Sequence, residues 1–233
     1  MTAPRRTSGD ERVELRVESI SCAESVRSDQ ELLRTGRPIV RVAVLGDRAL
    51  SVGVNVPENA PYLVRARAAG IPIVRRSSGG TAVIHDRGDL AFSIVLPRSD
   101  PRVGRDFVRA YARLGAGVAR WYGDHGVEAR WGAPPGLLEA YCLLGPRGQV
   151  LRAGGQVVSG AAQHLTGTAL LHHGAVPARV DRVLLAALFR SASPGPLDSL
   201  GGFAEVGITG PAPMLAQELG RAIAAGLGSP ESG

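Results

Sequence analysis

The stretch "RRSSGGTAVIHDRGDLAFSIVLP", from Arg75 to Pro97, places two arginines and a Gly-Gly step ahead of an apolar segment. The segment has the two-residue period of a strand with one buried face, and four side chains define that face: Leu90, Phe92, Ile94 and Leu96. Glycines let backbone N–H groups approach a ligand closely, and arginines bind carboxylate or phosphate oxygens. The spacing fits an anion-binding loop at a strand edge, and equally a solvated turn with surface charge.

The composition indicates a globular protein. With 233 residues and a 44% apolar fraction, the chain can bury one large core. No run approaches the roughly 18 apolar residues that span a bilayer, and the first residues lack the apolar core of a signal peptide. We therefore expect a cytoplasmic protein without a membrane partner.

The positive charge comes entirely from arginine. All 27 basic residues are arginines, the chain contains no lysine, and the net charge is +6. The protein therefore has no lysine of its own for Schiff-base or acid–base chemistry. A basic surface suits an acidic partner. Because aromatic residues make up only 4% of the chain, a stacking surface for nucleic acid is not expected.

The two cysteines, Cys22 and Cys142, are too few for a disulfide framework, which fits a reducing compartment. We interpret Cys22 as a small buried apolar side chain. For Cys142 two interpretations stay open at this point, a nucleophile and an ordinary strand cysteine.

The expected elements mix helices and strands without a strict βαβ alternation, which favours an α+β fold. Caps and apolar spacing predict helices over 28–36 (with Ser28 as cap and Gly36 as stop), 61–70, 102–123 and 213–228. Strands are expected within 38–54, 71–76, the apolar segment that ends in His85-Asp86, 89–97, 126–132 and 149–180. The predicted organisation is a disordered leader (1–11), a single catalytic domain (12–227) and a disordered tail (228–233).

Two motifs resemble the lipoate–protein ligase and octanoyltransferase family. The Arg75–Pro97 stretch is similar to that family's pattern R-R-x-[ST]-G-G-x-A-V-x-H-D-x-G. The segment "GGQVVSGAAQHLTGTALLHHGAVP" (154–177) resembles its G-R-K-x-x-G-S-A-Q motif and later H-G turn. The likeness covers about residues 25–227. It implies a mixed-sheet α+β catalytic domain of the biotin and lipoate protein ligase type, related to class II aminoacyl-tRNA synthetases.

The resemblance also implies a set of site residues. In the family the Arg-Arg…Gly-Gly loop holds the acyl group or, in ligases, the acyl-adenylate. The first motif assigns substrate binding to Arg75, Arg76, Ser78, Gly79, Gly80, Ala82 and His85. The second motif adds Val157, Ser159, Gly160 and His173. No metal-binding residues are expected.

The second motif departs from the family at the position of its lysine, which contacts the activated acyl carbonyl. The alignment places Val157 there, and Gln156 if shifted by one residue, with Arg152 as another possible source of charge. Loss of such a contact costs a ligase orders of magnitude in rate. One branch of the family instead uses a cysteine nucleophile upstream of the lysine, and Cys142 lies 15 residues before Val157.

Three hypotheses follow for the function. The leading hypothesis is an acyltransferase that needs no cofactor. It would move an octanoyl or lipoyl group from an acyl carrier protein or a lipoylated donor protein, through a Cys142 thioester, to a lysine of an acidic lipoyl-acceptor domain. The second is a lipoate–protein ligase that uses ATP and Mg. The third is an inactive module that binds the acyl group of lipoate or octanoate.

The transferase hypothesis carries three structural expectations. Gly79 and Gly80 should line a narrow apolar tunnel with Arg75 or Arg76 at its mouth. Val157 should point toward the same pocket. The sulfur of Cys142 should lie within several Å of the glycine loop or of the His172–His173 pair, because a nucleophilic thiol needs a neighbouring arginine or histidine.

Overall fold

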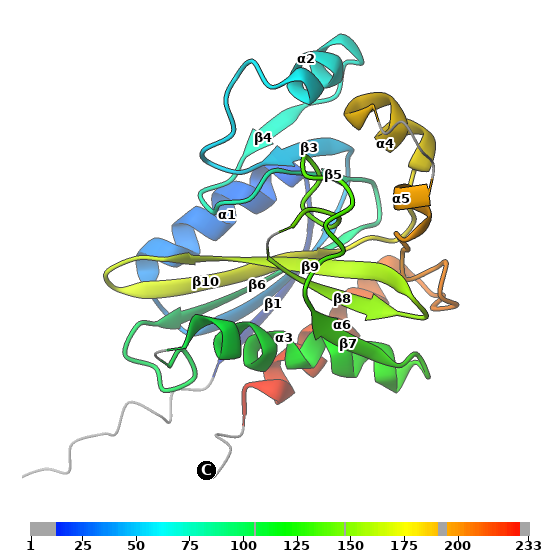
Figure 1. Ribbon diagram of the computed structural model, residues 1–233. Helices are drawn as coiled ribbons and strands as arrows, with labels where there is room; N and C mark the ends of the chain where they lie inside the picture. The colour runs from blue at the N-terminus through cyan, green and yellow to red at the C-terminus, as the bar shows by residue number, and fades with distance from the viewer. Residues whose placement is uncertain (1–12, 105, 147, 191–194, 229–233) are drawn as a thin grey trace, which may run out of the picture.

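The computed structural model describes residues 13–104, 106–146, 148–190 and 195–228. A large seven-stranded sheet forms its centre, in the order β1-β2-β6-β10-β9-β8-β7 (Figure 1). Strands β1 and β2 are parallel, and every other pair in this sheet is antiparallel. The strands are β1 (Glu14–Ile20), β2 (Ile39–Leu45), β6 (Leu90–Pro97), β7 (Ala129–Gly132), β8 (Gln149–Ala153), β9 (Gln156–Leu165) and β10 (Ala169–Val176). This mixed sheet confirms the predicted α+β class.

A small second sheet has the order β4-β3-β5. Its strands are β3 (Ala49–Val52), β4 (Ile73–Arg75) and β5 (Ala82–His85). The sequence predicts two strands around the turn at Gly46–Asp47, and both form, but β2 joins the large sheet and β3 the small one. The chain therefore crosses between the sheets at this turn.

Helices cover both faces of the large sheet (Figure 1). On one face, α3 and α6 pack together over a core that includes all four alternating side chains of β6. On the other face lie α1 and the small sheet, with α2 and α4 packed against each other beyond it. The helices are α1 (Cys22–Thr35), α2 (Pro61–Ala68), α3 (Phe107–Asp124), α4 (Arg182–Phe189), α5 (Gly195–Asp198) and α6 (Ala212–Gly226).

The predicted start of the first helix is wrong. Helix α1 begins at Cys22, because Ser21 accepts from the Glu24 amide while the Glu24 carboxylate accepts from the Ser21 amide, which is a complete capping box. Ser28 therefore lies inside the helix. The predicted stop is correct, since Gly36 closes the helix at a left-handed φ of 61°.

Strand β1 and helices α4 and α5 are additions to the elements predicted from the sequence. The predicted leader, and the predicted tail beyond residue 228, lie outside the described residues. The assignment of residues 12–227 to a single catalytic domain stays a prediction. Within the described part of the chain, no helix combines the length and the apolar character needed to cross a membrane.

Candidate functional site

A cavity of about 580 Å³ opens between the two sheets. Its walls come from α1, from the small sheet, from the segment joining β7 to β8, and from β6, β9 and β10 of the large sheet. The volume lies within the range of small-molecule sites, and the walls are mostly apolar with a few polar groups. An apolar wall interrupted by a small number of polar groups suits an acyl chain with one reactive end.

Cys142 lies on the wall of this cavity, next to the Gly79–Gly80 loop. Its backbone N–H donates to the Ala82 carbonyl at 2.9 Å, which ties the β7–β8 segment to the start of β5. The sulfur accepts from the Thr81 amide at 3.0 Å and from Nη2 of Arg76 at 3.4 Å. A cation and an aligned backbone N–H stabilise a negative charge on sulfur. The side chain is partly exposed, so a reagent can reach it.

Gly80 has no room for a side chain. Its φ is +90°, and a Cβ atom there would lie 2.9 Å from Nη2 of Arg76 and 3.0 Å from the Cys142 sulfur. The same loop rests on Gly53, where a Cβ would come within 2.1 Å of the Gly80 carbonyl oxygen. Both glycines are therefore required by close approach of the backbone.

The two adjacent arginines take different positions. Arg76 lines the cavity, and Nη2 also donates to the Gly79 carbonyl at 2.9 Å. The Arg75 guanidinium turns away, donates to the Gly53 and Val56 carbonyls, and pairs with Glu58. Either Arg75 or Arg76 was expected at the mouth of the pocket. The structure places Arg76, and not Arg75, in the cavity wall. The reason is that successive residues leaving a strand point to opposite sides.

The predicted substrate-binding residues therefore divide into two groups. Six line the cavity together with Cys142: Arg76, Gly79, Gly80 and His85 of the first motif, and Gly160 and His173 of the second. Five others are not among the described residues that line it: Arg75, Ser78, Ala82, Val157 and Ser159. For these five residues, the geometry does not support the predicted contact with substrate.

Val157 differs most from the expectation. Its side chain is fully buried in the core between β9 and the α4–α5 region, and it does not face the cavity. The segment after α5 covers this end of β9, since the Val157 amide donates to the Ser199 carbonyl at 2.6 Å and the Gly201 amide donates to the Val157 carbonyl at 2.9 Å. Neither Arg152 nor Gln156, the alternatives for the missing cation, is among the described cavity-lining residues.

The other second-motif positions are structural or form the wall. The Ser159 hydroxyl donates to the Ala175 carbonyl at 2.7 Å within the sheet. Gly160 lines the cavity, where a Cβ would lie 2.3 Å from Leu143. The small residues of β9 therefore let the β7–β8 segment, with its cysteine, lie close against the large sheet.

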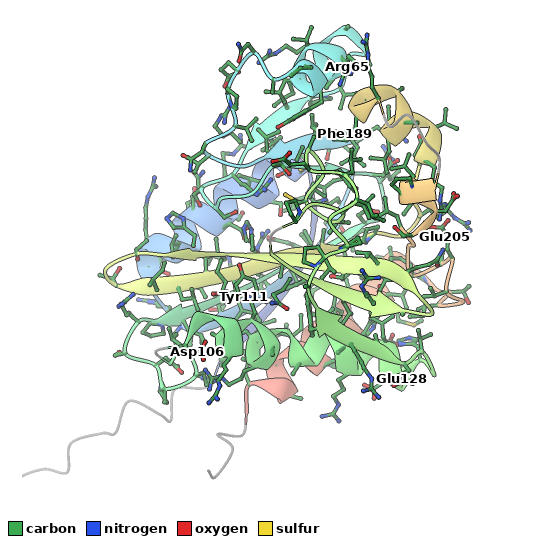
Figure 2. All side chains as sticks on the ribbon, in the orientation of Figure 1. Arg65, Asp106, Tyr111, Glu128, Phe189 and Glu205 are labelled. Carbon is green, nitrogen blue, oxygen red and sulfur yellow. The ribbon has the colours of Figure 1, made fainter. Side chains whose placement is uncertain are left out.

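The two adjacent histidines face opposite sides of β10. His173 lines the cavity, whereas His172 packs edge-on against Tyr111 of α3, with 5.4 Å between the ring centroids. Figure 2 labels Tyr111 between α3 and the sheet. Burial, followed by the charge of His173, lowers the pKa of His172 to about 3. His172 is therefore a neutral core residue. It is not a partner of the Cys142 thiol, a role that the sequence alone had left open.

His85 lines the cavity at the end of β5. Burial lowers its pKa to about 4, helped by the charges of Arg76 and His173. The neutral ring has a buried Nδ1 without a hydrogen-bond partner among the described residues. His85 is therefore a neutral ring in the cavity wall.

Replacing His172 with phenylalanine should flatten the loss of stability in acid. The folded-state pKa of about 3 lies below the unfolded value of 6.5, so between these pH values the unfolded chain binds a proton that the folded chain does not. Stability therefore falls as the pH falls through this window, by up to about 1.4 kcal/mol per pH unit for one group. Urea unfolding at pH 7, 6 and 5 measures it. Identical slopes for the variant and the wild type would contradict the assignment.

Two contributors to the site are missing from the predicted set. The Thr81 amide, directly after the Gly-Gly step, is the nearest donor to the sulfur. Asp29 of α1 lines the cavity and contacts His173. The position of Thr81 inside the first motif was a usable signal. Nothing in the sequence around Asp29 distinguishes it from a surface helix residue.

Comparison with known proteins identifies the family. The family model described as the lipoyl protein ligase A/B catalytic domain matches residues 21–199, which include both motifs and Cys142. The chain belongs to this family. The similar curated proteins include the octanoyltransferase LipM of Exiguobacterium sp. strain AT1b, 32% identical over 187 residues that cover 73% of this chain and 67% of that protein.

A second LipM, from Exiguobacterium sibiricum, is 33% identical over 126 residues, which cover 50% of this chain and 45% of the relative. The chain thus spans between about half and two thirds of the length of these relatives.

Solved structures support the same fold. A lipoate-protein ligase A bound with ATP superposes with a TM-score of 0.75 at 24% identity, covering 93% of this chain and 86% of that one. A bipartite lipoate protein ligase from Thermoplasma acidophilum, described with its E2 lipoyl domain, gives a TM-score of 0.71 at 23% identity, covering 92% of this chain and 84% of that one.

Proposed function

We propose that the protein transfers an octanoyl or lipoyl group to a lysine of an acceptor protein through a thioester on Cys142. The observation that carries the proposal is the position of the sulfur, which lies on the cavity wall with Thr81 N–H and the Arg76 guanidinium directed at it. The LipM relatives, named as octanoyltransferases, support the same reaction.

The reaction takes two steps. The Cys142 thiolate attacks the carbonyl carbon of the donor thioester, so a new carbon–sulfur bond forms and the donor leaves as its own thiolate. The acceptor amine then attacks the Cys142 thioester, a carbon–nitrogen bond forms, the Cys142 thiolate is released, and the amine loses a proton to solvent. The attacking lysine belongs to the acceptor, so a lysine-free chain is compatible with both steps.

Donor and acceptor are proposed to be acidic proteins. The chain has a net charge of +6, and all of its basic residues are arginines. A positive net charge accelerates the encounter with a negatively charged protein, and salt weakens this effect. An acyl carrier protein or a lipoylated donor protein would bring the acyl group, and a lipoyl-acceptor domain would take it. The Thermoplasma ligase described with its E2 lipoyl domain is the precedent for such an acceptor.

Incubation with octanoyl-acyl carrier protein, without ATP, tests the proposal. The protein should gain the mass of one octanoyl group on the peptide that contains Cys142, and an added lipoyl domain should discharge it. No gain in mass with this donor, or a gain on another residue, would refute the proposed route.

The same assay separates the competing hypotheses. A ligase would exchange pyrophosphate into ATP when lipoate is present, and acyl transfer would stop when ATP is withheld. A binding module would take up octanoate without a covalent adduct. The absence of lysine from the chain is the observation that disfavours the ligase.

A further inference from the structure

A continuous chain of hydrogen bonds runs from helix α1 to the proposed nucleophile. His173 bonds through Nδ1 to Asp29 Oδ2 at 2.9 Å and through Nε2 to the Ser78 hydroxyl at 2.7 Å. The Ser78 oxygen in turn accepts from Nε of Arg76 at 3.1 Å, and Nη2 of the same guanidinium reaches the Cys142 sulfur. The chain crosses the cavity wall from α1 through β10 to the glycine loop.

The anchor of this chain is a buried ion pair. Arg41 is fully buried, and its Nη2 donates to Asp29 Oδ1 at 2.6 Å, while Nη1 pairs with Glu18 at 3.0 Å. Burial acts to raise the pKa of Asp29, but Arg41 and the hydrogen bonds from His173 and Ser93 outweigh it, so this pKa lies below its usual value. Asp29 is therefore a carboxylate that can only accept, and the bond from His173 Nδ1 must be a donated one.

That constraint fixes the direction of the first bond in the chain. Whichever group donates in the bond between His173 Nε2 and the Ser78 hydroxyl, the Ser78 oxygen keeps a lone pair. That lone pair accepts from Nε of Arg76, while the Ser51 hydroxyl accepts from Nη1 at 3.4 Å. The carboxylate in α1 thus sets the orientation of the arginine beside Cys142.

The order Asp–His–Ser is also that of a hydrolase triad, but the surroundings of Ser78 exclude that role for it. The residue is 1% exposed and is not among the described residues lining the cavity, so no acyl carbonyl can reach its oxygen. Its lone pair is directed at a guanidinium. Cys142, which is partly exposed and lies one step farther along, is the group that an acyl donor can meet.

We propose that Asp29 and His173 are positioning residues that act through Ser78 to hold Arg76 against the Cys142 sulfur. The inference rests on the proposed function, in which this sulfur is the nucleophile. The Gly79 and Thr81 carbonyls hold the Nη2 end of the guanidinium, and Ser78 holds the Nε end. Nη1 also reaches the Ser51 hydroxyl of β3 at 3.4 Å, and among the described residues it is the Ser78 contact that connects the arginine to His173 and Asp29.

The test measures the rate of Cys142 alkylation by iodoacetamide in Ser78→Ala, His173→Phe and the double variant, with the labelled peptide located by mass spectrometry. Each single change should slow alkylation by roughly fivefold, because the arginine loses its orientation. The double variant should be no slower than either single one, since both break the same connection. Ser199→Ala, which removes a hydroxyl bonded to the Pro196 carbonyl, is the matched control.

Acyl loading from octanoyl-acyl carrier protein provides the second readout: kcat should fall with KM unchanged. Unchanged alkylation in the single variants, or a double variant slowed by the product of the two effects, would overturn the inference. If His173→Phe does not fold, Ser78→Ala against Ser199→Ala decides alone. Alkylation needs no acyl donor, so a wild-type protein that is never acylated would refute the proposed function while leaving the alkylation result to decide the inference.

Discussion

Replacing Cys142 with serine is expected to remove the octanoyl adduct and to lower the transfer rate by about a thousandfold or more. The groups hydrogen-bonded to the sulfur are the Thr81 amide, the Thr81 hydroxyl and the Arg76 guanidinium, and none of them is a base. Donors stabilise a thiolate, but they cannot take the proton from a serine hydroxyl, which needs a base to become a nucleophile. Intact-mass analysis and a transfer assay measure the two effects.

The other cysteine provides the control. Cys22 also contributes to the cavity wall at the start of α1, but it is only 1% exposed and burial raises its pKa to about 12, so its thiol is not a competing nucleophile. Cys22→Ala should still gain one octanoyl group on Cys142. A Cys142→Ser variant that transfers octanoyl groups at the wild-type rate would show that the thioester route is wrong.

Gly80→Ala should reduce acyl loading by about a hundredfold while the protein still folds. The added Cβ falls 3.0 Å from the Cys142 sulfur and 2.9 Å from Nη2 of Arg76, so one of these groups must move. A displacement of this size at a reacting atom is enough for such a loss. Loading is measured by mass spectrometry over time with octanoyl-acyl carrier protein.

Gly88→Ala is the matched control for backbone strain. Gly88 has a φ of +89°, close to the +90° of Gly80, but its Cβ would meet only Ala178 at 4.0 Å. Both variants should lose thermal stability because alanine is strained at this φ, and Gly80→Ala carries the added cost of its contacts with Arg76 and Cys142. Only the Gly80 variant should lose loading. Equal loading in the two variants would mean that the close approach to the sulfur is unimportant.

Local sequence patterns predicted the elements in which buried side chains recur at a regular spacing along the chain. The alternation in β6 is regular because one face packs on the α3–α6 core, and Gly36 ends α1 because it can adopt a left-handed φ. The start of α1 was not predictable from Ser28 alone. Ser21 is a second candidate cap, because it follows strand β1 and has Glu24 three residues later. In the structure the capping box forms between Ser21 and Glu24, so the helix begins there.

The site was predictable only in part, because its contacts join distant segments. The cysteine-using branch of the family placed Cys142 near the glycine loop, and the sulfur does lie 3.0 Å from the Thr81 amide. Which of Arg75 and Arg76 faces the cavity depends on how β4 packs. The burial of Val157 depends on coverage by the segment after α5. Neither contact has a local pattern in the sequence.

The hydrogen bond from the Cys142 amide to the Ala82 carbonyl connects residues 60 positions apart, at the seam between the two sheets. The donors around the sulfur come from the far side of that seam, so they reach it only after the small sheet has docked. A partly folded chain therefore lacks these donors at the sulfur. The capacity of Cys142 to be acylated should arise only once the two sheets have docked, so the rate of thiol labelling would report on the completed tertiary structure.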